Sequence, residues 1–236
     1  MKKIILPLLI TVAVIIGTNG PEIFKVTGNQ FKSDPSLVPA AGEHIAPLNT
    51  PFSHSKYFVE LTNPVDKWDG KIVEIFWLGC PHCQSLEPLL QQWKSDNNMS
   101  IHYVPATANA AWESDAKLVM AVQRVTKNYE NYHPELLRYK KETHFKIKTI
   151  KDVEKLFNET SLKDNTAISP EILFKEMNLT EVSAANKWTK DFLISNRVRG
   201  VPTVVINGTH ILRSDLKGSF NNTFIPALNY AKENMM

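Results

Sequence analysis

Residues 71–90 read KIVEIFWLGCPHCQSLEPLL, an apolar run that ends in two closely spaced cysteines and continues into a second apolar pattern. The nearly continuous run at 71–77, interrupted by Glu74, predicts a central strand buried on both faces. From Pro81 onward apolar residues recur at every third or fourth position, which predicts a helix that begins with a tolerated proline. Residues 100–105 predict another buried strand. Together these segments predict a βαβ unit with the cysteines at its first turn.

The remaining pattern adds elements before and after this unit. Residues 56–61 predict a short strand, and residues 112–197 carry several 3.6-residue apolar patterns that predict a group of helices. The stretch 202–213 predicts a hairpin, because it contains the Asn-Gly dipeptide that type I′ turns prefer. Residues 219–234 predict a last helix. The expected order is therefore β, β, α, β, a helical insertion, β, β, α.

The N-terminal region predicts export. Residues 1–20 combine a basic start, a 13-residue apolar core at 4–16 and a polar end. That core suits a secretory segment and is short for a membrane span, which needs ~20 residues. Cutting after Gly20 would leave proline at the new N-terminus, so a cleaved signal peptide and a retained membrane anchor both stay open. Residues 21–55 contain five prolines and no regular period, which predicts a proline-rich linker. In either case the body faces an oxidising compartment.

Composition and charge narrow the class of protein. The 236 residues are 43% hydrophobic and 22% charged, which is typical of a soluble globular protein with a sizeable core. The 27 basic and 24 acidic residues nearly balance, and Lys2 and Lys3 account for two of the basic ones. Because no basic face is concentrated anywhere in the chain, nucleic acid is not an expected partner.

The two cysteines, Cys80 and Cys83, are the only ones in the chain, and their spacing fits several kinds of site. A structural zinc site uses four ligands, but there is no second pair, and His82 between the cysteines is badly placed to share their metal. Attachment of a c-type haem needs histidine directly after the second cysteine, where Gln84 stands. A structural disulfide across so short a loop would remove little entropy from the unfolded chain. Redox exchange is the remaining interpretation.

Two motifs resemble those of one known family. VEIFWLGCPHC at 73–83 resembles the active-site run of the DsbA-type thiol:disulfide oxidoreductases, including an acid six residues before the first cysteine. RGVPTVVING at 199–208 resembles the family's loop of valine and cis-proline with its following hairpin. The resemblance implies an α/β chain with a thioredoxin-like fold and an inserted helical domain. The thioredoxin-like domain would comprise 56–111 and 198–236, and the helical domain 112–197.

The residues of the CPHC turn suggest how the pair would work. Cys80 should lie just before the helix N-terminus, where free N–H groups and the helix dipole favour a thiolate. It would be the exposed sulfur that is attacked, while Cys83 faces the core and acts as the resolving partner. His82 could add a positive charge or an N–H donor near the sulfur, or be a solvated turn residue. Pro81 is a further candidate for tuning the pair. Gly79 stands where many relatives have an aromatic residue, which predicts a more open surface near Cys80.

Four more residues are candidates for the site. Glu74 could relay protons beneath the cysteines, or point outward into solvent. Glu87 on the predicted helix could tune the pair electrostatically, although acids on helix surfaces usually serve solubility alone. The resemblance implies that Val201 presents its backbone to an extended substrate peptide and that the Val201–Pro202 bond is cis. No metal site is expected, since the histidines away from the turn look dispersed along the sequence: His102, His133, His144 and His210.

The resulting hypothesis is a thiol:disulfide oxidoreductase that introduces disulfides into exported, unfolded proteins. It would donate its Cys80–Cys83 disulfide through a mixed disulfide at Cys80, with no cofactor besides that redox-active pair. The resemblance implies reoxidation by a DsbB-like membrane quinone oxidoreductase, and a location in the periplasm, with a possible tether to the inner membrane through residues 4–16. The alternatives are an isomerase or reductase kept in the reduced state, and a chaperone or binding module on a thioredoxin-like scaffold.

Overall fold

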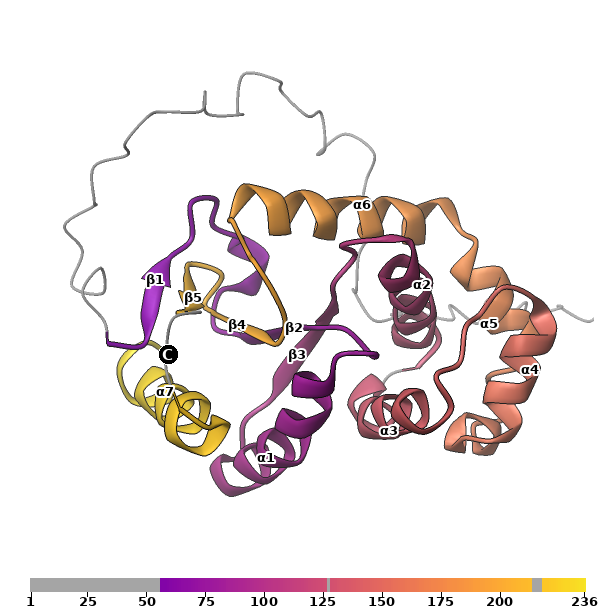
Figure 1. Cartoon of the computed structure of the whole chain (residues 1–236), viewed down its shortest axis with the longest axis horizontal. Helices are drawn as coiled ribbons and strands as arrows, with labels where there is room; N and C mark the ends of the chain where they lie inside the picture. The colour runs from indigo at the N-terminus through magenta and orange to yellow at the C-terminus, as the bar shows by residue number, and fades with distance from the viewer. Residues whose placement is uncertain (1–55, 127, 214–217) are drawn as a thin grey trace, which may run out of the picture.

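The computed structural model describes residues 56–126, 128–213 and 218–236. The expectations for residues 1–20 and 21–55 therefore fall outside the described residues. Among the described residues, no helix combines the length and the apolar character that crossing a membrane requires. The described chain forms one mixed sheet with helices on both of its faces and a group of helices beside it (Figure 1).

Five strands form the sheet in the order β1-β5-β4-β2-β3. The strand β2 lies between β3, with which it is parallel, and β4, with which it is antiparallel. All five residues of β2 are buried, as expected for a strand that is covered on both faces. The bounds are β1 Phe58–Glu60, β2 Ile72–Phe76, β3 Ile101–Pro105, β4 Thr203–Ile206 and β5 His210–Leu212.

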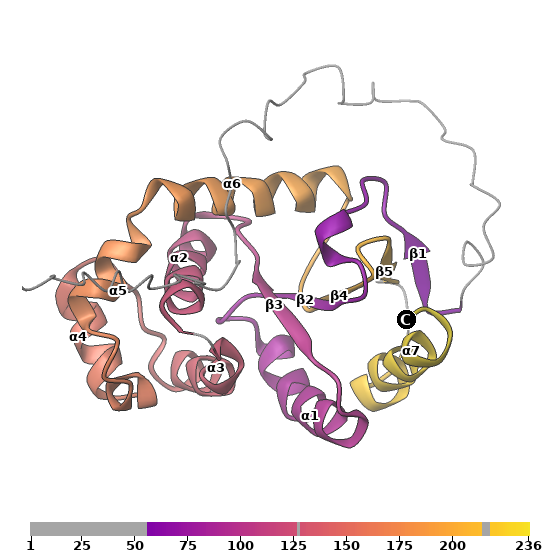
Figure 2. The same ribbon diagram turned by 180° about the vertical axis from the view of Figure 1, so that it is seen from behind.

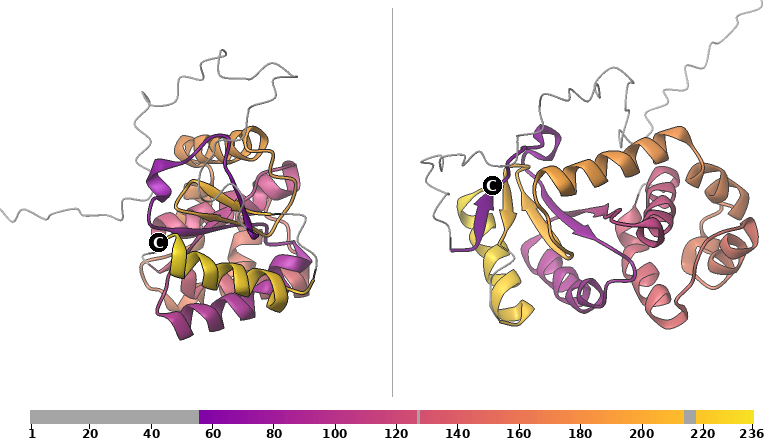
Figure 3. Two further views of the ribbon diagram at one scale, coloured as in Figure 1. Left: turned by 90° about the vertical axis from the view of Figure 1, so that its left-hand side faces the viewer. Right: turned by 45° about the horizontal axis from the view of Figure 1, so that its top comes forward.

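Two helices, α1 and α7, each follow a strand of the sheet outside the insertion, whereas α2 to α6 are inserted between β3 and β4. Figure 3 shows α1 and α7 on one side of the sheet and α6 on the other. From behind, the inserted helices extend to one side of the sheet (Figure 2). The bounds are α1 Pro81–Asn97, α2 Ala110–Val125, α3 His133–Thr143, α4 Ile150–Asn158, α5 Pro170–Met177, α6 Thr180–Ser195 and α7 Phe220–Asn234, with short 3₁₀ turns at Asp66–Trp68, Tyr129–Asn131 and Ser161–Asp164.

This order of elements confirms the expected sequence of strands and helices, with boundaries that differ by at most two residues. The helix α1 begins at Pro81 as expected and continues as one element through Pro88. The inserted helices begin at Ala110, two residues before the expected start of a helical domain. The division into domains at 111/112 and 197/198 stays a prediction.

The side chains of β2 alternate between two cores, and this alternation decides the direction of Glu74. Ile72 and Phe76 belong to the core on the side of α1, whereas Val73 and Ile75 pack in the core that includes Phe192 of α6. Because successive side chains of a strand point to opposite faces, Glu74 points to the same side as Ile72 and Phe76. It is 1% exposed. The alternative of an outward, solvated Glu74 is therefore wrong.

The hairpin that precedes the last helix forms as the sequence predicts. Asn207 and Gly208 both have positive φ, 53° and 66°, as a type I′ turn requires. A Cβ atom on Gly208 would lie 2.1 Å from the backbone oxygen of Val65. Glycine is required here both by the φ angle and by the close approach of the neighbouring backbone.

Candidate active site

The two cysteines lie where β2 leads into α1. Cys80 is the N-cap of α1, with Pro81 in the first turn, and the Cys83 N–H donates a hydrogen bond to the Cys80 sulfur at 3.2 Å. Both cysteines are free thiols in this structure. A sulfur that accepts N–H groups at the positive end of a helix is stabilised as a thiolate.

The environment lowers the pKa of Cys80 from about 9 to about 6. The largest cause is a hydrogen bond from the Cys83 side chain, and backbone N–H groups of Cys83 and His82 and the charge of His82 act in the same direction against a desolvation cost. For Cys83 the pKa is raised, first by burial, then by its hydrogen bond with Cys80 and by the charge of Glu74. At neutral pH one sulfur of the reduced pair is therefore a thiolate and the other a thiol.

The expected exposure of Cys80 is wrong for this reduced form. Cys80 is 5% exposed and Cys83 is fully buried. The reason is the loop before β4, because the Val201 carbonyl lies 3.3 Å from the Cys80 sulfur and accepts a hydrogen bond from it when Cys80 is protonated. The Val201–Pro202 peptide bond in this loop is cis, in line with the expectation. The two motifs, 121 residues apart in sequence, thus meet at the sulfur.

His82 and Pro81 are both exposed in the first turn of α1. The His82 ring approaches the Phe220 ring edge-to-face, with 6.2 Å between the ring centroids. His82 reaches Cys80 through its backbone N–H and through the charge of its side chain, so its position permits the expected tuning. Pro81 lacks an N–H, which at this position would have no partner within the helix.

The expectation of a more open surface beside Gly79 is also wrong. A Cβ atom on Gly79 would lie 2.4 Å from the Trp77 ring, so an indole occupies the adjacent space. Trp77 stacks on Trp112 at 4.7 Å and donates a hydrogen bond to Asp115 at 2.7 Å. Asp115 in turn pairs with Lys140 of α3 at 2.8 Å. These contacts tie the loop that carries Cys80 to the inserted helices.

Beneath the cysteines lie three buried ionisable side chains, Glu74, Glu87 and His133, which we call the acid–histidine cluster. They are 1%, 4% and 0% exposed, and one donor atom from each lies within 4.8 Å of the others. The alternative of a solvent-exposed Glu87 that serves solubility alone is therefore wrong, because Glu87 lies on the inner face of α1, one turn after Cys83. The expectation that His133 lies apart from other ionisable residues is also wrong, because the fold brings the start of α3 against β2 and α1.

Burial and mutual repulsion shift the pKa values in this cluster. Burial, then the charges of Glu87 and Cys80, raise the pKa of Glu74 well above its ordinary value, which favours the protonated form of Glu74. Burial lowers the pKa of His133, against the hydrogen bond and charge of Glu87. Three donor atoms are fewer than the four that structural zinc sites use, and the absence of a metal stays a prediction. A protonated carboxyl close to a leaving or attacking thiol can exchange a proton with it.

The lowered pKa of Cys80 makes a direct prediction about the reduced protein. Its ultraviolet thiolate absorbance should titrate with a midpoint near pH 6, and the transition should be lost in Cys80→Ala. Because this pKa is below that of the unfolded chain, Cys80 adds stability that is fully present above about pH 9 and is lost as the pH falls through about 6. Denaturant unfolding of the reduced protein across this range measures the second effect. A midpoint near 9 would contradict the described sulfur environment.

Comparison with known proteins agrees with this fold. No protein-family model matches the sequence. The chain is 26% identical over 164 residues to the thiol:disulfide interchange protein DsbA of Pseudomonas aeruginosa, covering 67% of this chain and 74% of that protein. A crystal structure of a variant of that DsbA has a TM-score of 0.61 at 23% identity, covering 75% of this chain and 94% of that one.

A second solved structure contains a peptide. It is a cysteine-to-serine variant of Proteus mirabilis DsbA with a non-covalently bound peptide, PWATCDS, and has a TM-score of 0.56 at 17% identity, covering 75% of this chain and 96% of that one. The likeness in arrangement confirms the expected α/β, thioredoxin-like fold with inserted helices.

Proposed function

We propose that this chain, a DsbA-type thiol:disulfide oxidoreductase by its sequence and fold, is an oxidase that donates its Cys80–Cys83 disulfide to exported, unfolded proteins. The observation that carries the proposal is the opposite shift of the two cysteine pKa values. Stabilising Cys80 as a thiolate stabilises the reduced form of the protein, and this makes the disulfide form more oxidising.

The exchange is a pair of substitutions at sulfur. A substrate thiolate attacks the Cys80 sulfur of the disulfide, the Cys80–Cys83 bond breaks, and its electron pair leaves on Cys83. A second substrate thiolate then attacks the substrate sulfur of the mixed disulfide, and Cys80 departs as a thiolate. The substrate loses two electrons and forms one disulfide, while the protein gains two thiols. The low pKa of Cys80 makes it the better leaving group in the second step.

Glu74 is the proposed proton donor for Cys83. Cys83 leaves the disulfide as a thiolate in buried surroundings that favour its thiol, so it needs one proton. Glu74 points to the side of β2 that α1 covers, has a raised pKa that favours its protonated form, and interacts electrostatically with both sulfurs. On reoxidation the same carboxylate would take the proton back as Cys83 attacks.

The loop at Val201 and Pro202 is the proposed contact for substrate. The Val201 carbonyl already accepts a hydrogen bond from the Cys80 thiol, so a chain aligned with this loop would bring its own cysteine to that sulfur. An extended peptide can pair with a free backbone edge as an added strand. The peptide bound to the Proteus mirabilis relative contains a cysteine and supports this type of ligand.

The remaining parts of the proposal follow from the sequence. The apolar segment at 4–16 supports export, so we propose that the protein works in the periplasm, either released or tethered to the inner membrane through that segment. Reoxidation would come from a DsbB-like membrane quinone oxidoreductase. No bound cofactor is required, because the Cys80–Cys83 disulfide is itself the oxidant.

Equilibration of the full chain with glutathione buffers tests the proposal. We expect a reduction potential more positive than about −180 mV, the value of protein disulfide isomerase, together with stoichiometric oxidation of a reduced cysteine-pair peptide by the oxidised protein. A potential near that of thioredoxin, about −270 mV, would instead favour a reductase or an isomerase kept reduced. Substrate refolding without any thiol oxidation would favour the chaperone alternative.

A further inference from the structure

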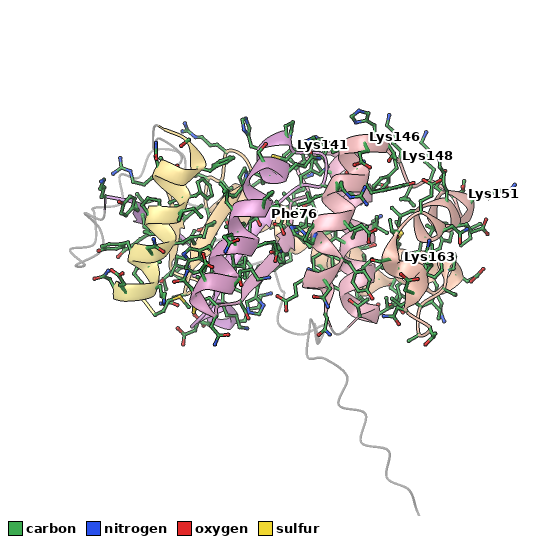
Figure 4. The ribbon with its side chains drawn as sticks, turned by 90° about the horizontal axis from the view of Figure 1, so that it is seen from below. Phe76, Lys141, Lys146, Lys148, Lys151 and Lys163 are labelled. Atoms are coloured by element: carbon green, nitrogen blue, oxygen red, sulfur yellow. The ribbon has the colours of Figure 1, made fainter. Side chains whose placement is uncertain are left out.

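The acid–histidine cluster is assembled from three elements that share one core. Glu74 comes from β2, Glu87 from α1 and His133 from the first residue of α3. The His133 ring stacks on the Tyr103 ring at 3.8 Å and meets the edge of Phe76 at 4.4 Å. Figure 4 shows Phe76 in the interior, between α1 and α3. An imidazole enclosed by aromatic rings has no water to stabilise a charge, so its charge state depends on its protein partners.

Each ring nitrogen of His133 faces one polar partner. Its Nδ1 lies 2.9 Å from the Tyr129 hydroxyl, and its Nε2 lies 3.3 Å from Glu87 Oε2. The other oxygen of Glu87 accepts a hydrogen bond from Gln91 at 2.5 Å. Apart from the approach of His133 to Glu87, none of the described residues gives a hydrogen-bond partner to His133 Nε2, Glu87 Oε2 or Glu74 Oε2. Each of the three side chains thus contributes a buried polar atom without a further partner among the described residues, and donor atoms of the three lie within 4.8 Å of one another.

The ionisation states of Glu74, Glu87 and His133 depend on one another. Two carboxylates within 4.8 Å of each other in a buried site repel strongly, so both ionise only if a positive charge lies beside them. His133 is the member of the cluster that can become positive. It can donate Nδ1–H to Tyr129 and Nε2–H to Glu87 when protonated, since both ring nitrogens are then donors.

Among the residues that the structure describes, the other charged groups around the cluster do not supply this compensation. Lys94 of α1 is paired with Glu130 at 2.9 Å, and its charge lowers the pKa of His133 rather than neutralising the acids. The phenols of Tyr103 and Tyr129 have raised pKa values, first because of burial, and stay neutral. Five labelled lysines of the inserted region are exposed to solvent (Figure 4): Lys141, Lys146, Lys148, Lys151 and Lys163.

We propose that His133 is a positioning residue for the proton that Cys83 exchanges, because protonation at Nε2, beside Glu87, permits Glu74 to ionise. This inference rests on the proposed oxidase function and adds a residue to its chemistry. When Cys83 leaves the disulfide, the Glu74 carboxyl gives it one proton, and His133 takes up one proton from solvent at Nε2, so that the imidazolium beside Glu87 balances the negative charge on Glu74. When Cys83 attacks during reoxidation, its proton returns to Glu74, His133 releases its own proton to solvent, and the cluster regains its starting charge.

The test is the pH dependence of the rate at which Cys83 attacks a mixed disulfide at Cys80 and forms the protein disulfide. Reduced full-length protein is mixed with oxidised glutathione, the reaction is quenched with acid, and mass spectrometry follows conversion of the Cys80–glutathione adduct to the protein disulfide. In His133→Gln the amide keeps the size and the hydrogen bonding of the ring but cannot carry a charge. We expect the midpoint of the rate to move to higher pH by at least about one unit, and the rate below the midpoint to fall about tenfold.

Two further variants separate this electrostatic role from a structural one. Adding Glu87→Gln to His133→Gln removes the negative charge that His133 balances, so the midpoint should return toward that of the unchanged protein. Tyr129→Phe removes the partner of Nδ1–H and should shift the midpoint in the same direction as His133→Gln, by a smaller amount. It also serves if His133→Gln folds poorly. The titration of the Cys80 thiolate should move little in any of these variants, because none of them contacts Cys80.

Three outcomes would overturn the inference while leaving the proposed function intact. The first is a pH profile in His133→Gln that overlaps that of the unchanged protein, provided that the unchanged protein forms its disulfide. The second is a double variant whose defects simply add. The third is a stoichiometric metal ion in the purified protein that is lost in His133→Gln. If the unchanged protein forms no disulfide with oxidised glutathione at any pH, the oxidase proposal itself fails.

Discussion

Cys80→Ala is expected to reduce the oxidation of substrate thiols by about 1,000-fold or more, to the background rate. Without Cys80 no disulfide can form within the protein, and the remaining sulfur has no route to substrate. Cys83 is fully buried, and burial raises its pKa so that it is a thiol at neutral pH. The variant and the unchanged protein are treated with oxidant in parallel. The measurement is the rate at which each then converts a reduced two-cysteine peptide to its disulfide.

A matched control keeps this result interpretable. Ser85→Ala changes an exposed residue on the same helix, whose hydroxyl donates a hydrogen bond to the Pro81 carbonyl at 2.9 Å, and should retain near-normal oxidation. Far-ultraviolet circular dichroism of both variants checks that α1 still forms. If Cys80→Ala still supports the protein's role in cells while oxidising no thiols, the chaperone alternative gains and the oxidase proposal fails.

The sequence predicts the fold well because its local signals agree with one another. The apolar run at 71–77, the proline that begins α1 and the Asn-Gly turn each specify an element, and all three occur where expected. The direction of Glu74 could also be predicted, since strand alternation places it on the side of Ile72 and Phe76. The burial of Glu87 had a signal too, because position 87 follows Cys83 by four residues and so lies on the apolar stripe of its helix.

Other features of the site depend on contacts between distant segments. His133 begins a helix of the insertion, and nothing in its neighbouring residues indicates that it will meet β2 and α1. The burial of Cys80 likewise depends on Val201, which lies 121 residues away in sequence. Trp77 occupies the space beside Gly79 because Asp115 and Trp112 of α2 hold its ring there. Side-chain contacts across an insertion are set by tertiary packing, and local periodicity carries no information about them.

The opposite properties of the two sulfurs also yield the second large prediction. Cys83→Ser, treated with oxidised glutathione, should accumulate a stable mixed disulfide at Cys80, because no second sulfur can displace the glutathione. Serine is preferred to alanine here, since a hydroxyl can still donate the hydrogen bond that is the largest cause of the low Cys80 pKa. The unchanged protein should pass through the same adduct and complete its own disulfide. Mass spectrometry of acid-quenched samples follows both species.

The reciprocal variant Cys80→Ser leaves Cys83 as the lone thiol and should form the adduct at least about 100-fold more slowly at neutral pH. Two effects act in the same direction. Cys80 with a pKa of about 6 is mostly thiolate at neutral pH, whereas the raised pKa of Cys83 leaves it as the unreactive thiol. Cys83 is also fully buried, so a disulfide must enter the core to reach it. Equal rates in the two variants would show that neither the helix N-terminus nor burial distinguishes the sulfurs. The assignment of Cys80 as the attacked sulfur and Cys83 as the resolving one would then fail.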